Sequence, residues 1–81
     1  MDNYDDTRRT RQFISATRAR AAGHETEALL LEKRGSTLLD AKARGRHYAA
    51  AAVHWRQAAC ARQQADRLND AIPPVVVGQE Q

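Results

Sequence analysis

The sequence predicts an all-α protein. Between Asp6 and Ile72 the chain has no proline and few β-branched residues, and it consists mainly of Ala, Arg, Gln, Glu and Leu. These residues favour helices because they lose little side-chain freedom in them. With 16 alanines in 81 residues, we expect one helical domain over residues 1–72. The tail 73–81 opens Pro-Pro-Val and is expected to be disordered or docked on a partner.

The first helix is expected to begin at Asp5 or Asp6, where a carboxylate can cap the free backbone amides. Gly23 is a suitable C-cap and would end this helix near Ala22. A second helical stretch is expected over residues 25–34. Apolar and small side chains recur at helical spacing in the first helix: Phe13, Ile14, Thr17 and Ala21.

The last helix is expected from about Thr37 to Ala71, after a loop signal at residues 35–37. Thr37 with Asp40 three residues later approximates a capping box, and Pro73 and Pro74 would end the helix. The stripe expected to form its core is Leu38, Ala41, Gly45, Tyr48, Ala51, Ala52, Trp55, Ala58, Ala59, Ala65, Leu68 and Ile72. The basic and amide residues expected largely off this stripe are Arg44, Arg46, Arg56, Gln63 and Arg67.

Two architectures satisfy these elements. The first is an antiparallel helical hairpin with a first arm over residues 6–34 and a turn at Gly35; the second is a small three-helix bundle with breaks at Gly23 and at Gly35 or Gly45. In either case alanine provides helix but little core volume, so an isolated 81-residue chain would be marginally stable. We therefore expect a homo-oligomer, most simply a dimer that forms a larger helical bundle.

Residues 45–58 resemble the second helix of a tetratricopeptide repeat. That repeat carries a glycine followed by Tyr-x-x-Ala-x-x-x-aromatic-x-x-Ala, and the corresponding residues here are Gly45, Tyr48, Ala51, Trp55 and Ala58. One extra residue separates Gly45 from Tyr48, and the preceding helix lacks the family's aromatic residue. The resemblance covers about 30 residues and implies a protein-binding surface without catalysis.

No catalytic, metal or cofactor site is expected. His47 and His54 lie two helical turns apart, about 10 Å, which is too far for one zinc ion to bind both within a helix. The histidines are expected at the surface or rim, and Cys60 is expected to be a small buried thiol. The sequence also lacks a glycine-rich phosphate loop and a nucleophile motif, so we do not expect an enzyme.

Arginines and a few large apolar residues are the candidate contact residues. The net charge is only +3, so the arginines could contact an acidic protein, nucleic acid or solvent alone. The electrostatic candidates are Arg8, Arg9, Arg11, Arg18, Arg20, Arg44 and Arg46. The candidates for a partner or dimer interface are Phe13, Ile14, Leu30, Leu31, Tyr48, Trp55 and Leu68.

The leading functional hypothesis is a small non-enzymatic module that binds another protein and modulates it, as an adaptor, inhibitor or anti-activator. Analogy with the accessory genes of phages and mobile elements suggests a host-directed version. The alternatives are a nucleic-acid-binding transcriptional regulator that uses the Arg-rich first helix, and a structural subunit of a larger assembly. The longest apolar runs, residues 29–31 and 49–53, are too short to span a membrane, so a cytoplasmic location is expected.

Overall fold

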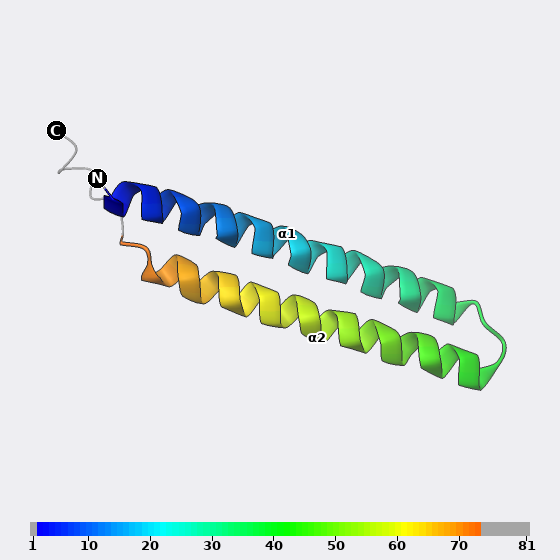
Figure 1. Cartoon of the computed structure of the whole chain (residues 1–81). Coiled ribbons are helices and arrows are strands. Elements are labelled where there is room, and N and C mark those ends of the chain that lie inside the picture. Colours follow the sequence, from blue (N-terminus) through cyan, green and yellow to red (C-terminus); the bar gives the residue numbers. More distant parts are fainter. Residues whose placement is uncertain (1, 74–81) are drawn as a thin grey trace.

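Two long antiparallel helices joined by a short loop make up the computed structural model of the chain (Figure 1). It describes the backbone of residues 2–73 and the side chains of residues 5–73. Helix α1 runs over Asp2–Ser36 and helix α2 over Ala41–Ala71. The two helices lie side by side, and the start of α1 and the end of α2 lie together at the end of the hairpin away from the loop (Figure 1). The all-α prediction and its hairpin version are confirmed.

Helix α1 contains no break, and the three-helix alternative is not formed in the described residues. The helix continues through Gly23, where the cost of an interior glycine is only about 1 kcal/mol. Its first residue is Asp2, so the expected start at Asp5 or Asp6 was wrong. Acidic residues in an opening turn favour the helix because they face the positive end of its dipole.

The loop begins two residues later than expected, and the predicted cap was wrong. Asp40 is the N-cap of α2, and its Oδ2 accepts a hydrogen bond from the Ala43 amide at 2.9 Å. The Thr37 hydroxyl instead donates to the carbonyl of Arg34 at 2.8 Å, which closes the end of α1. Both residues are good caps, and each serves a different helix end.

Helix α2 ends at Ala71, as the prolines predicted. Ile72 is extended, and its amide donates to the Asn69 carbonyl at 3.1 Å. Pro73 follows and cannot continue a helix, because it has no amide proton. The expected docking or disorder of the tail falls mainly on residues 74–81, which lie outside the described part of the chain.

The helices pack through a seam of buried and half-buried residues spaced alternately by three and four. This is the 3.5-residue period of coiled coils, in which one narrow stripe of each helix faces the other. In α1 the seam residues are Ile14, Thr17, Ala21, His24, Ala28, Leu31 and Gly35. In α2 they are Arg44, His47, Ala51, His54, Ala58, Ala61, Ala65 and Leu68.

Most of the fully buried residues of the seam are alanines. Ala21, Ala28 and Ala65 are completely buried, and Ala21 packs with Ala58 and Ala61 in one cluster. The largest side chain that is fully buried is that of Thr17. Small residues allow two helix backbones to approach closely, but each buries little apolar area.

The predicted stripe of α2 was only partly correct. Ala51, Ala58 and Ala65 are in the seam, whereas Gly45, Tyr48 and Trp55 are exposed. The seam also includes His47, His54 and Ala61, and half-buried Arg44, which were not expected there. Alanines occupy several faces of this helix, so their spacing alone does not identify the buried one.

Substitution of the three helical glycines by alanine tests the close approach at the loop end. A Cβ on Gly35 would lie 3.0 Å from His47 Cβ and 3.2 Å from Tyr48 Cε1, whereas Gly23 and Gly45 have open space around them. We expect Gly23→Ala and Gly45→Ala each to raise the free energy of unfolding by about 0.5–1 kcal/mol. Gly35→Ala should lower it by about 1 kcal/mol or more, because the crowded atoms must shift. Urea unfolding followed by circular dichroism measures both effects; equal gains at all three positions would contradict the packing.

Substitution of Thr17 tests the polar atom in the seam. Thr17 is 0% exposed, and its hydroxyl has no hydrogen-bond partner among the described residues. Thr17→Val keeps the shape and removes the hydroxyl, so it should stabilise the hairpin by about 1 kcal/mol. The matched control is Thr26→Val, because the exposed Thr26 hydroxyl donates to the Ala22 carbonyl at 3.0 Å. The control should show no gain; a loss of stability in Thr17→Val would show that the hydroxyl is satisfied.

Candidate functional site

The large apolar side chains of the hairpin lie mainly on its outside. Of the predicted interface residues, Ile14 is buried, Leu31 and Leu68 are half-buried, and the others are exposed. The exposed large apolar residues are Phe13 (48%), Leu29 (56%), Leu30 (39%), Leu39 (97%), Tyr48 (43%), Val53 (43%) and Trp55 (37%). The outer surface of the helices is therefore richer in large apolar groups than the seam between them.

Two aromatic residues border one edge of the seam. Tyr48 and Trp55 each follow a seam histidine by one residue, so both side chains project along the same edge of α2. The Trp55 indole Nε1 donates to Glu32 Oε2 on the facing helix at 3.0 Å. The Tyr48 ring lies against buried Gly35. Both rings are anchored at one side and remain partly exposed.

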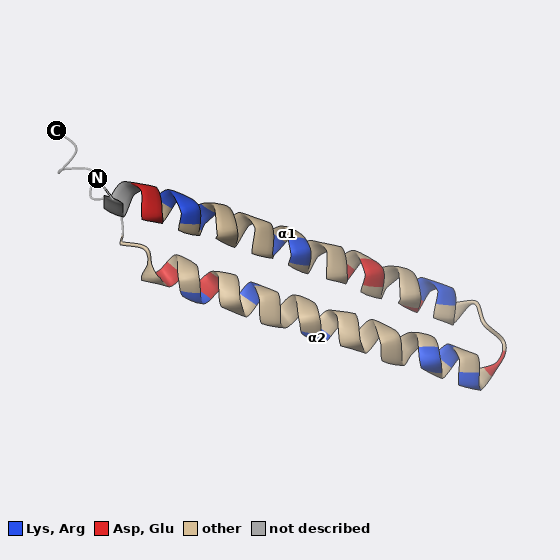
Figure 2. Ribbon diagram, viewed as in Figure 1, with Lys and Arg blue, Asp and Glu red and all other residues tan. Residues whose placement is uncertain are grey.

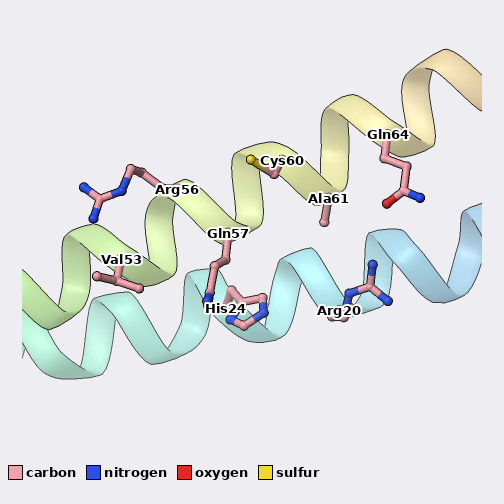
Figure 3. Close-up of a pocket in the computed structure, with 8 residues that line it drawn as sticks. All are labelled: Arg20, His24, Val53, Arg56, Gln57, Cys60, Ala61 and Gln64. Carbon is pink, nitrogen blue, oxygen red and sulfur yellow. The ribbon is translucent and has the colours of Figure 1, made fainter.

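A groove of about 550 Å³ follows the opposite edge of the seam (Figure 3). Val53 and Ala61 supply apolar surface, and Arg20 from α1 and Arg56 from α2 supply positive charge. The remaining lining residues are His24, Gln57, Cys60 and Gln64. The groove contains no carboxylate, so its charge complements an acidic ligand. Cys60 is exposed here, and its predicted burial was wrong.

Most of the candidate arginines point to solvent in the described part of the chain. Arg18 pairs with Asp66 at 3.3 Å, and Arg44 donates to the Leu38 carbonyl at 2.9 Å, so only these two have described partners. The other five candidates are exposed: Arg8, Arg9, Arg11, Arg20 and Arg46. Basic residues also gather at the loop end of both helices (Figure 2).

The basic residues suit the dipole of one helix and not of the other. The last turn of α1 contains Lys33 and Arg34, which favour that helix. The first turn of α2 has no acidic residue and contains Lys42, and its last turn has no basic residue. Positive charge near a helix N-terminus opposes the helix dipole, so the charges of α2 do not stabilise it in this way.

A bidentate ion pair joins the helices beside the aromatic edge. Arg62 Nε and Nη2 donate to the two carboxylate oxygens of Glu25 at 2.7 and 2.6 Å. These bonds hold the pKa of Glu25 below its ordinary value of 4.5, chiefly because they stabilise the charged carboxylate. The same bonds raise the pKa of Arg62.

Two histidines meet across the middle of the seam. The Nδ1 atoms of His24 and His54 are 2.9 Å apart, and the ring planes are inclined by 35°. The third histidine has a different partner: His47 Nδ1 lies 2.9 Å from the Ala43 carbonyl of its own helix. The sequence predicted all three histidines at the surface or rim and did not predict the His24–His54 contact. A contact between residues 30 positions apart depends on the register of the two helices.

The described residues contain no group of three or more His, Cys, Asp or Glu side chains placed to hold a metal ion. Neither described helix is apolar enough over sufficient length to cross a membrane. Comparisons with models of known protein families, with curated proteins and with solved structures give no match to this chain.

Acid titration tests the ion pair. Because the pKa of Glu25 is lowered by folding, its contribution to stability is present above pH 4.5 and is lost as the pH falls through the lower folded value. We expect Glu25→Gln to reduce the loss of stability below pH 4.5, although only modestly, since both partners are partly exposed. Glu27→Gln is the matched control, and it should leave the acid profile unchanged. Identical profiles for the two variants would contradict the role of the pair.

Proposed function

We propose that this chain is a small non-enzymatic interaction module that binds another protein and modulates its activity. The observation that carries the proposal is the distribution of large apolar groups: alanines fill the seam, while Trp55, Tyr48, Leu29 and Leu30 are 37–56% exposed. Trp, Tyr and Arg residues contribute most of the binding energy in many protein interfaces. Adaptor, inhibitor and anti-activator roles are all forms of this proposal.

The chemistry of the outer surface favours a partner that is apolar and acidic. The groove is lined by Val53 and Ala61 together with Arg20 and Arg56, so a docked segment that carries both apolar side chains and carboxylates would complement it. Further basic residues lie in α1 near the open end of the hairpin, where Arg8, Arg9 and Arg11 are exposed (Figure 2). We infer that electrostatic attraction orients the partner and apolar contacts hold it.

Self-association is part of the proposal. The hairpin leaves most of its large apolar side chains open to solvent, from 37% exposure at Trp55 to 56% at Leu29 on the helices, so two helices do not cover their own apolar surface. A dimer of hairpins would cover apolar area that a two-helix unit leaves open and would form a four-helix bundle. The partner could then bind across both copies or compete with the dimer for the same edge.

A nucleic-acid-binding regulator is the second candidate. Arg8, Arg9 and Arg11 are exposed within little more than one helical turn of α1, a density that suits phosphate contacts. The structural-subunit hypothesis depends on Val75 to Val77, which lie outside the described residues.

Capture with matched variants tests the proposal. Tagged wild-type chain should recover a stoichiometric protein from a bacterial lysate, and the purified pair should then be titrated. We expect Trp55→Gln or Val53→Gln to weaken binding at least tenfold, because each removes an apolar contact on one edge of the seam. Leu39→Gln is the control, since Leu39 is 97% exposed in the loop and lies on neither edge.

Three outcomes are informative. Equal loss in Leu39→Gln would show that the edges are not the binding surface. Failure to recover any protein, together with a salt-sensitive shift of duplex DNA that is lost in Arg8→Ala with Arg9→Ala, would favour the nucleic-acid function. A monomeric mass in light scattering at micromolar concentration would contradict the dimer but leave the interaction module standing.

A further inference from the structure

The His24–His54 pair is the only polar pair that spans the middle of the seam in the described chain. The layers on either side hold alanines, Ala21 with Ala58 and Ala28 with Ala51. The ring centroids are 5.1 Å apart while the Nδ1 atoms are 2.9 Å apart, so these two nitrogens point toward each other. This is the geometry of a direct hydrogen bond between the rings.

Such a bond requires that only one of the two Nδ1 atoms carries a hydrogen. One Nδ1 must carry a hydrogen and donate it, and the other must present a lone pair and accept it. The neutral pair meets this condition, and so does a pair that has taken up one proton. A pair that has taken up two has no acceptor left and places two positive rings 2.9 Å apart at their facing nitrogens.

The charged neighbours do not relieve this repulsion. On the groove edge, Arg20 and Arg56 line the same groove as His24 and add positive charge there. The thiol of Cys60 also lines this groove. On the aromatic edge the nearest carboxylates are already bonded, Glu25 to Arg62 and Glu32 to Trp55. Glu27, one turn beyond His24 in α1, is exposed, and no described hydrogen bond joins it to either ring.

His47 provides a contrast within the same seam. Its Nδ1 faces a carbonyl oxygen, so this nitrogen is the donor whether the ring is neutral or charged. Protonation of its other nitrogen leaves that bond intact. Protonation of both rings therefore breaks the His24–His54 bond, whereas protonation of His47 leaves its bond to the Ala43 carbonyl in place.

We propose that the His24–His54 pair is an acid-sensitive latch that holds the hairpin closed at neutral pH and releases it when both rings become charged. The latch acts on the seam and does not depend on the identity of any partner. Because His24 also lines the groove, opening the seam would disrupt the surface on which a partner is proposed to dock.

The sign follows from proton counts. In an unfolded chain both histidines take up a proton as the pH falls through about 6.5. The folded pair accepts at most one, so the unfolded state binds more protons and stability falls with falling pH. A difference of one proton raises the unfolding equilibrium constant up to about tenfold per pH unit. This occurs above the range in which carboxylates titrate, so it is separable from the effect of Glu25.

The experiment is urea unfolding of the full chain at intervals between pH 7.5 and pH 5, followed by circular dichroism. The wild type should lose stability in this interval with the slope given above. His24→Ala combined with His54→Ala extends the alanine layers through the middle of the seam and should abolish the slope. His47→Ala is the control and should retain it.

A slope that persists in the double variant, or that disappears equally in His47→Ala, would overturn the latch. If the double variant does not fold, the imidazole resonances of the wild type decide the matter by NMR. The latch requires His24 and His54 to titrate in two coupled steps, the second of which shifts the folding equilibrium toward the unfolded state. Three independent single-step titrations, with no loss of stability between pH 7.5 and pH 5, would refute it.

Discussion

The close approach of two helices through a seam of small side chains is the constraint on which the other features depend. A stripe of alanines can be buried only against another backbone at short range, and at the level of the alanines that range leaves little room for large groups between the helices. Tyr48, Trp55 and Val53 are displaced to the edges, where they border the junction of the helices without filling it. The outer surface therefore acquires the apolar character that the interior lacks, and a partner or a second copy can use it.

The polar groups differ between the two edges of the seam. On the aromatic edge, Glu25 with Arg62 and Glu32 with Trp55 join the helices by direct bonds. The groove edge contains cations without described carboxylate partners, notably Arg20 and Arg56. One edge thus carries the polar contacts between the helices, and the other carries positive charge that no described carboxylate neutralises. Between them, the His24–His54 pair contributes a bond whose strength depends on protonation.

Local signals predicted the fold class and left the hairpin as one of two possible architectures, but they did not identify the buried face. Helix propensity and the double proline act on neighbouring residues, so the helical content and the end of α2 at Ala71 follow from the sequence. The buried stripe of α2 does not follow from the sequence, because alanines at adjacent positions place small side chains on several faces of the helix. The choice between Thr37 and Asp40 as cap depends on where the loop closes. The histidine pair requires the register of two helices, which no single-helix pattern contains.

That register has its own consequence. Alanine layers are interchangeable, so a seam built from them alone would accept α2 slid by a heptad along α1 with little change in energy. A few features distinguish one alignment from the next. They are the bonds between the helices (His24 with His54, Glu25 with Arg62, and Glu32 with Trp55), the gap at Gly35 that admits His47 and Tyr48, and the short connection between Ser36 and Ala41. A lengthened loop would free the helices to slip or to exchange between chains, because so few contacts record the correct pairing. The length of the four-residue connection therefore helps to set the register of the two helices over the whole hairpin.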